Sequence, residues 1–175
     1  ELSAIPNTTA YLHVERSVEK LDGDRPKVGL CWAGNPNHDN DSNRSIDLKL
    51  LEPLLDLPGI DFFSLQIGSQ AGETVFAPRL QKLPGELDDF LDTARFVVAL
   101  DIVITVDSSI VHLAGALGQA VWVLLPYAPD WRWLLGREDS PWYPSASLFR
   151  QSQPGDWGVP VQEMRKKIVE NFDVI

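Results

Sequence analysis

Cysteine is almost absent from this chain. Cys31 is the only cysteine among 175 residues, so no disulfide can form within the chain. This usage is typical of proteins kept in a reducing compartment, and we expect a cytoplasmic protein. Cys31 falls in an apolar stretch, where we expect it to pack as a small hydrophobic side chain.

The sequence also lacks an excess of basic residues and any long apolar run. Fifteen Lys and Arg residues stand against 25 Asp and Glu residues, which gives a formal net charge of −10. Proteins that bind nucleic acid or an anionic membrane surface normally present a basic stripe, so the charge argues against both partners. No apolar run approaches the roughly 20 residues of a transmembrane helix, and we expect no transmembrane segment.

Several cofactor and catalytic motifs are missing. The first strand is followed by AGNPN instead of GxGxxG, and GxxxxGK[ST], CxxC, HExxH and GxSxG are all absent. Three scattered histidines make a metal site improbable, so we expect none. The first residues, ELSAIPNTTAYL, show neither an initiator Met nor a signal-peptide pattern, which indicates a cut inside a longer protein.

What is present is a regular alternation of apolar runs and helical patterns. Strands are expected over 27–33, 60–66, 101–106, 120–125 and 147–151, a short one over 80–83, and helices over 48–57, 88–100, 110–117 and 159–172. This order predicts an α/β fold with a doubly wound, Rossmann-like parallel sheet. We expect residues 1–26 to form a linker segment, with a short helix over 13–21, and residues 27–175 to form the folded lobe.

The chain is organised around residues 101–126, which predict a strand, a tight turn, a helix and a strand. Asp107, Ser108 and Ser109 follow the first strand and are residues that begin helices, and His112 lies one turn further on. Free N–H groups and the helix dipole at such a point could receive a phosphate or pyrophosphate. On local sequence alone the alternative is favoured, namely that these residues only begin a helix and His112 is packed or solvated.

Polar loops follow three of the predicted strands, and the ends of parallel strands meet at one edge of a sheet. These loops cover residues 34–44, 66–72 and 107–112. Arg44 is the lone cation beside the first loop, and its guanidinium could pair with phosphate oxygens. A surface salt bridge from Arg44 to Asp41 or Asp47 is an equally good interpretation.

Tryptophan is concentrated in one segment near the C-terminus. Trp131, Trp133 and Trp142 all fall within residues 127–143. We expect a packed loop with a short helix near 131–135, and the functional alternative is stacking of these rings against a sugar or base.

The longest motifs resemble a known family. VITVDSSIVHLAGALGQAVWVLLP resembles the donor-binding segment of the heptosyltransferase-like glycosyltransferases, D-[ST]-x-x-x-H-[LV]-A-x-A-L-G-x-P-V, with Ala120 at the usual proline. GLCWAGNPNHDNDSNRSIDL, FFSLQ and APDWRWLLGREDSPWYPSASLFRQ are similar to the C-terminal domains of bacterial tetratricopeptide-repeat proteins that carry a glycosyltransferase-like domain. The likeness extends over residues 27–172.

This resemblance implies the C-terminal, donor-binding lobe of a GT-B fold, which takes a nucleotide diphosphate-sugar as substrate without a metal or cofactor. The residues that would line the donor are Asn35, Arg44, Gln66, Asp107, Ser108, Ser109 and His112. The general base would lie on the missing first lobe, and the acceptor would be a protein, lipid or saccharide. One departure is Arg44, which follows the acidic loop HDNDSN and stands near the place of a family lysine.

Two other functions remain open at this stage. The lobe could be a non-catalytic interaction module attached to helical repeats, with residues 127–143 as its partner surface. It could also belong to a sugar-nucleotide epimerase, which shares the two-lobe fold.

Overall fold

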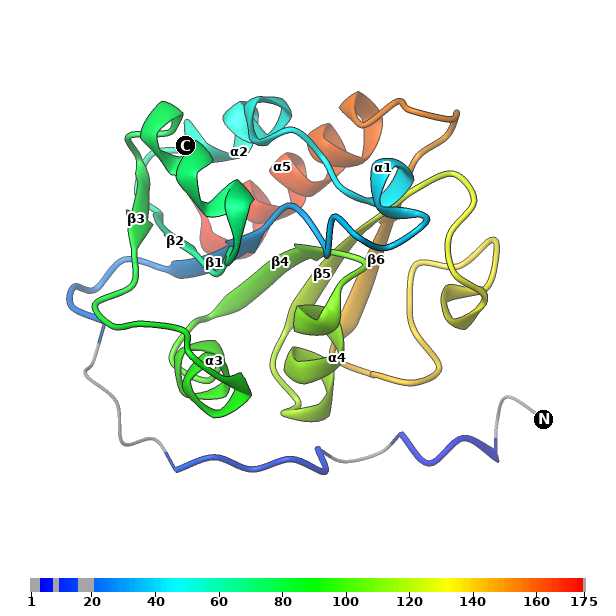
Figure 1. The fold of residues 1–175 in the computed structure, drawn as a ribbon, viewed down its shortest axis with the longest axis horizontal. Helices are drawn as coiled ribbons and strands as arrows, with labels where there is room; N and C mark the ends of the chain where they lie inside the picture. The colour runs from blue at the N-terminus through cyan, green and yellow to red at the C-terminus, as the bar shows by residue number, and fades with distance from the viewer. Residues whose placement is uncertain (1–3, 8–9, 16–20, 175) are drawn as a thin grey trace.

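A single parallel sheet forms the centre of the protein in the computed structural model, which describes residues 4–7, 10–15 and 21–174. The strands run in the order β3-β2-β1-β4-β5-β6, and every neighbouring pair is parallel (Figure 1). They are β1 (Lys27–Cys31), β2 (Asp61–Ser64), β3 (Leu80–Lys82), β4 (Ile102–Val106), β5 (Val121–Leu125) and β6 (Ala146–Arg150). The predicted Rossmann-like sheet is confirmed, because this order is that of the doubly wound dinucleotide-binding folds.

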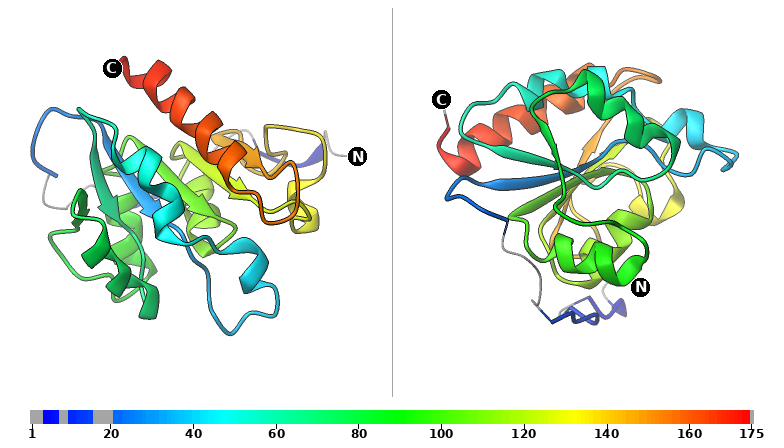
Figure 2. Two further views of the ribbon diagram at one scale, coloured as in Figure 1. Left: turned by 90° about the horizontal axis from the view of Figure 1, so that it is seen from above. Right: turned by 60° about the vertical axis from the view of Figure 1, so that its left-hand side comes forward.

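Helices cover both faces of the sheet (Figure 2). The α-helices are α1 (Asp41–Arg44), α2 (Glu52–Leu55), α3 (Phe90–Val97), α4 (Ser109–Ala116) and α5 (Gly158–Phe172); the 3₁₀ helices are η2 (Leu48–Leu51), η3 (Ser69–Phe76) and η4 (Trp131–Trp133). Helices α2 and α5 pack on one face, and α3 and α4 pack on the other. Strands β4 and β5 are buried along their whole length, as their β-branched and aromatic residues require.

The sheet is closely packed around β1. A Cβ on Gly29 would lie 2.5 Å from Leu100 Cδ1 and 2.8 Å from Leu65 Cδ1. Leu30 of β1 is paired with Ile104 of β4, so the two strands run side by side through the core. Their ends, which carry two of the predicted polar loops, are therefore held next to each other.

Three local predictions need correction. The helix expected over 48–57 is divided into η2 and α2, because Pro53 at the start of α2 has no N–H to donate. The loop expected over 66–72 gives way at Ser69 to the eight-residue 3₁₀ helix η3 (Ser69–Phe76). The helix expected over 88–100 begins only at Phe90, where Asp89 accepts hydrogen bonds from the N–H groups of Leu91 and Asp92.

The described part of the N-terminal segment lies against helix α4. The N–H groups of Tyr11 and Leu12 both donate to the carbonyl of Ala116, each at 3.0 Å, and Asn7 Nδ2 donates to the carbonyl of Pro141. Residues 16–20 of the helix expected over 13–21 lie outside the described residues, and 13–15 are not helical. Within the described ranges, no helix is both long and apolar enough to cross a membrane.

Candidate functional site

A cleft lies at the carboxyl edge of the sheet, where β1 and β4 are neighbours. This is the point at which the strand order reverses, and ligands of such sheets bind there. The cleft has a volume of about 800 Å³. Its polar lining includes Gly34, Asn35, Arg44, Gln66, Gln70, Ser108 and Ser109. Residues from all three predicted polar loops therefore meet in one cavity.

The start of helix α4 forms one wall of the cleft. Ser108 Oγ accepts a hydrogen bond from the N–H of Ile110 at 3.3 Å. Thr105 Oγ1 donates to the carbonyl of Val106 and lies 3.0 Å from Ser108 Oγ, so the two hydroxyls share a hydrogen bond that orients Ser108. Ser109 is exposed, and the remaining N–H groups of the first turn have no partner within the helix.

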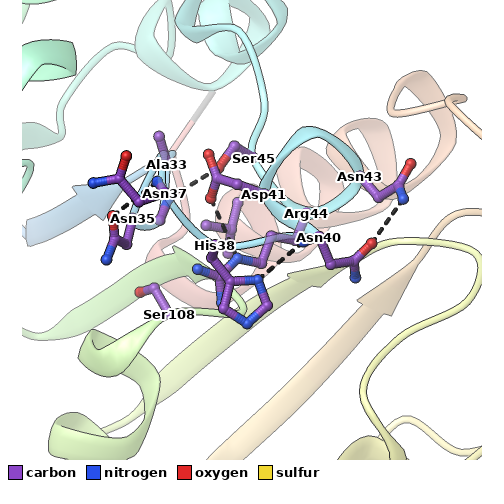
Figure 3. Close-up of polar contacts among 12 residues, drawn as sticks. Ala33, Asn35, Asn37, His38, Asn40, Asp41, Asn43, Arg44, Ser45 and Ser108 are labelled. Atoms are coloured by element: carbon purple, nitrogen blue, oxygen red, sulfur yellow. Dashed lines mark hydrogen bonds and ion pairs between the residues drawn. The ribbon is translucent and has the colours of Figure 1, made fainter.

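Arg44 lies at the opposite end of the first polar loop from Asn35 (Figure 3). It is packed against Gly34. A Cβ on Gly34 would lie 2.6 Å from Arg44 Nη2, so only glycine leaves room for the guanidinium. Arg44 Nε donates to Asp41 Oδ1 at 3.3 Å, and the same oxygen accepts a hydrogen bond from Ser45 Oγ. The salt bridge with Asp41 considered from the sequence is thus present, and the guanidinium also lines the cleft.

Gln66 is buried, and its carboxamide is occupied by backbone groups. Oε1 accepts from the N–H groups of Trp32 and Ala33, and Nε2 donates to the carbonyls of Ala33 and Ile67. These bonds fix the backbone directly after β1. Gln66 therefore shapes the cleft, and contact of its side chain with a ligand stays a prediction.

Asn35 is exposed on the loop that overhangs the cleft (Figure 3). Its Oδ1 accepts from the N–H of Asn37 at 3.0 Å, and its carbonyl accepts from the N–H of His38. The loop is thus ordered by its own amide groups, as short Asn-rich turns are.

His112 and Asp107 do not line the cleft, although the sequence grouped them with Ser108 and Ser109. The His112 ring stacks on the buried Trp133, with centroids 5.7 Å apart, and its Nδ1 lies 3.1 Å from Tyr143 Oη. Burial lowers the pKa of His112, and the carboxylate of Asp107 opposes this shift. The packed histidine weighed from the sequence is what the structure contains, and a contact of either residue with a donor stays a prediction.

The sequence did not reveal the apolar wall of the cleft. Ile67, Leu87 and Phe90 line it, together with the carboxylate of Asp88. Phe90 is exposed, and it is the first residue of helix α3. The run of two aspartates before Phe90 was the available signal, since the second of them begins the helix.

Cys31 also borders the cleft, as a free and buried thiol. Its Sγ lies 3.9 Å from Ser108 Oγ, and burial raises the pKa of the thiol. The expected small core side chain is confirmed. Across the described part of the chain, no three His, Cys, Asp or Glu side chains are placed so that they could hold a metal ion.

Solved structures of glycosyltransferases share this fold. E. coli ADP-heptose LPS heptosyltransferase II superposes with a TM-score of 0.60 at 18% identity, over 86% of this chain and 49% of that chain. E. coli heptosyltransferase WaaC with ADP superposes with a TM-score of 0.55 at 17% identity, over 86% of this chain and 45% of that chain. The protein thus has the Rossmann-like fold that makes up about half of these GT-B enzymes.

A sequence relative carries a longer chain. Protein FlbA of Caulobacter vibrioides is 34% identical over 162 residues, which are 87% of this chain and 26% of FlbA. The chain therefore spans about a quarter of the length of this relative. No protein-family model matches the chain.

Proposed function

We propose that this chain is the donor-binding lobe of a metal-independent glycosyltransferase that uses a nucleoside diphosphate-sugar. The observation that carries the proposal is the cleft where β1 and β4 adjoin, because it combines a cation, a helix start and an apolar wall in one cavity. These are the three groups that a nucleoside diphosphate needs. The fold alone does not name a substrate, and the proposal supplies one. ADP is the first nucleotide to test, because one structural neighbour was solved with it.

Charge decides how such a donor lies in the cleft. The protein is strongly acidic, so a diphosphate needs local donors. Arg44 and the first turn of α4 supply them, while the carboxylates of Asp88 and Asp89 belong to the wall formed by α3. The diphosphate therefore lies toward Arg44 and Ser109, and the nucleoside lies toward the apolar wall.

The chemistry of this lobe is stabilisation of the leaving group. When the bond between the anomeric carbon and the diphosphate oxygen breaks, negative charge grows on the departing phosphate. The N–H groups at the start of α4 and the Arg44 guanidinium are fixed before the reaction and offset that charge. The general base that activates the acceptor belongs to another part of the enzyme, as does the acceptor site. Attachment to tetratricopeptide repeats is part of the same proposal.

Titration calorimetry with ADP, UDP and GDP tests this function. We expect one of them to bind with a dissociation constant of about 1 mM or tighter, and Arg44→Ala to weaken that binding about tenfold. Arg25→Ala is the matched control, because it removes the same charge from a solvent-exposed salt bridge with Asp61 that does not line the cleft. Failure of all three nucleotides to bind would remove the basis of the proposal.

Exposed apolar side chains on η3 favour the interaction module as the second candidate. Val75 and Phe76 both project into solvent, and neither lines the nucleotide cleft. A lobe that only docks a partner would bind no nucleotide, so the same titration separates the two functions.

A further inference from the structure

A second exposed feature lies on the loop that follows β5. The 3₁₀ helix η4 turns Trp131 outward and Trp133 inward: Trp131 is 65% exposed, whereas Trp133 is fully buried. We call Trp131, Arg132 and Trp142 the indole ledge. It follows the carboxyl end of β5, the strand next to β4, so it borders the same edge of the sheet as the cleft (Figure 1).

Several contacts fix the ring of Trp131 despite its exposure. Trp142 packs edge-on against it, with centroids 6.1 Å apart, and Trp142 Nε1 donates to the carbonyl of Arg132 at 3.0 Å. The Arg132 guanidinium lies 4.8 Å from the Trp131 ring centroid and is paired with Asp130 at 2.7 Å. Asp130 Oδ1 also accepts a hydrogen bond from the N–H of Arg132, so Asp130 caps the start of η4. The ledge is therefore a preorganised surface and not a loose side chain.

Charged groups surround this flat ring. The Arg132 guanidinium lies over the ring and is paired with Asp130, and Trp133 of the same 3₁₀ helix stacks on His112 of helix α4, with centroids 5.7 Å apart. The ledge is thus linked to the residues that follow β4, directly beside the helix start. The Arg132 guanidinium lies over part of the Trp131 ring, and the rest of the ring stays exposed. That exposed indole surface suits the apolar C–H face of a sugar ring, and the paired Asp130 and Arg132 beside it suit the sugar's hydroxyls.

We propose that the indole ledge is a saccharide subsite, in which a sugar ring stacks on Trp131 and hydrogen-bonds to Asp130 and Arg132. Its placement beside the start of α4 deepens the proposed function, since a sugar attached to a diphosphate at that helix start would extend toward this loop. A nucleobase is the less suitable occupant, because the apolar wall of Ile67 and Phe90 already offers it a place.

The test follows the indole Nε1–H resonances of the six tryptophans by NMR. The probes are a nucleoside diphosphate that binds the cleft, its sugar conjugate (ADP-glucose, UDP-glucose or GDP-mannose), and the free methyl glycosides of glucose and mannose. We expect the Trp131 resonance to move with a sugar-bearing probe and not with the nucleotide alone. Movement with the conjugate only identifies the donor sugar, and movement with a free glycoside identifies an acceptor saccharide.

Variants separate this subsite from the cleft. Trp131→Ala is expected to lower the affinity for the sugar-bearing probe about threefold to tenfold and to leave nucleotide affinity unchanged. Trp131→Phe, which keeps an aromatic ring, is expected to retain most of the affinity for that probe. Phe76→Ala is the control, since it removes another exposed aromatic ring, 75% exposed, from outside both sites. If no sugar-bearing probe moves Trp131, the subsite is overturned even where nucleotides bind. If no nucleotide binds, the proposed function is lost, and the free glycosides still decide the subsite.

Discussion

The carboxamide of Gln66 forms two opposed hydrogen bonds with the backbone of Ala33. Oε1 accepts from the Ala33 N–H at 2.9 Å, and Nε2 donates to the Ala33 carbonyl at 3.1 Å. The Gln66 side chain, just after β2, thereby makes the hydrogen bonds that a neighbouring strand would make to Ala33. Ala33 directly precedes the first polar loop of the cleft. The position of that loop depends on this one amide.

Replacing Gln66 by Leu should unfold the protein more easily and distort the cleft. The N–H groups of Trp32 and Ala33 would lose their acceptor in a buried place, which costs about 1–3 kcal/mol for each unpaired group. Urea denaturation measures the loss, and Gln70→Leu, in the same cleft, should change stability by less than about 0.5 kcal/mol. A stable Gln66→Leu protein would mean that water or another group takes over these bonds.

Gly115→Ala should destabilise the protein through Tyr143. A Cβ at this position would overlap Cγ of the Tyr143 ring, which packs directly over the helix. Because Tyr143 also bonds to His112, the expected cost is about 1–3 kcal/mol, as for other overpacked sites. Thermal unfolding checks this, with Gly72→Ala as the control, since a Cβ there meets nothing within 4 Å. Equal melting temperatures for the two variants would contradict the prediction.

Gly34→Ala should reduce nucleotide affinity with little effect on folding. The added methyl group would push the Arg44 guanidinium out of the place it occupies against Gly34. We expect the dissociation constant for the nucleotide to rise about tenfold, since a charge-assisted contact is lost. The decisive measurement is the double-mutant cycle by calorimetry: in an Arg44→Ala background, Gly34→Ala should have a much smaller effect, because only Asp41 Oδ1, 2.8 Å from the added Cβ, still lies in its way. Additive effects would show that Gly34 acts in some other way.

Acid should weaken the fold through His112. Burial holds the pKa of this histidine below its ordinary value of 6.5. Between the two pKa values His112 is therefore protonated in the unfolded chain and neutral in the folded chain. This contribution to stability is therefore constant above pH 6.5 and falls as the pH drops from 6.5 toward the lower pKa of the folded state. Denaturation at several pH values measures it. His112→Gln should flatten this part of the profile, and an unchanged slope would assign the loss to other groups.

The sequence predicted the framework of the site better than its details. The run Ile102–Val106 is β-branched and apolar, so its burial on both faces followed from the residues alone. The meeting of the three polar loops followed from parallel strand order. Each of these inferences needs only local pattern and the geometry of a parallel sheet.

The details depend on contacts between distant parts of the chain, which no local pattern records. Gln66 is occupied by a segment 33 positions away, and His112 faces Tyr143, 31 positions away. Side-chain roles were therefore less predictable than backbone positions.

The central position of strand β1 determines when the cleft can form during folding. It pairs on one side with β2 and on the other with β4, and the backbone of Lys27 is bonded to Asp101, 74 positions later. The two walls that face each other across the cleft are thus joined only when most of the chain has been synthesised. Nucleotide capture should appear only once β4 has joined the sheet, and a ribosome-bound chain that ends before β4 should have none of it.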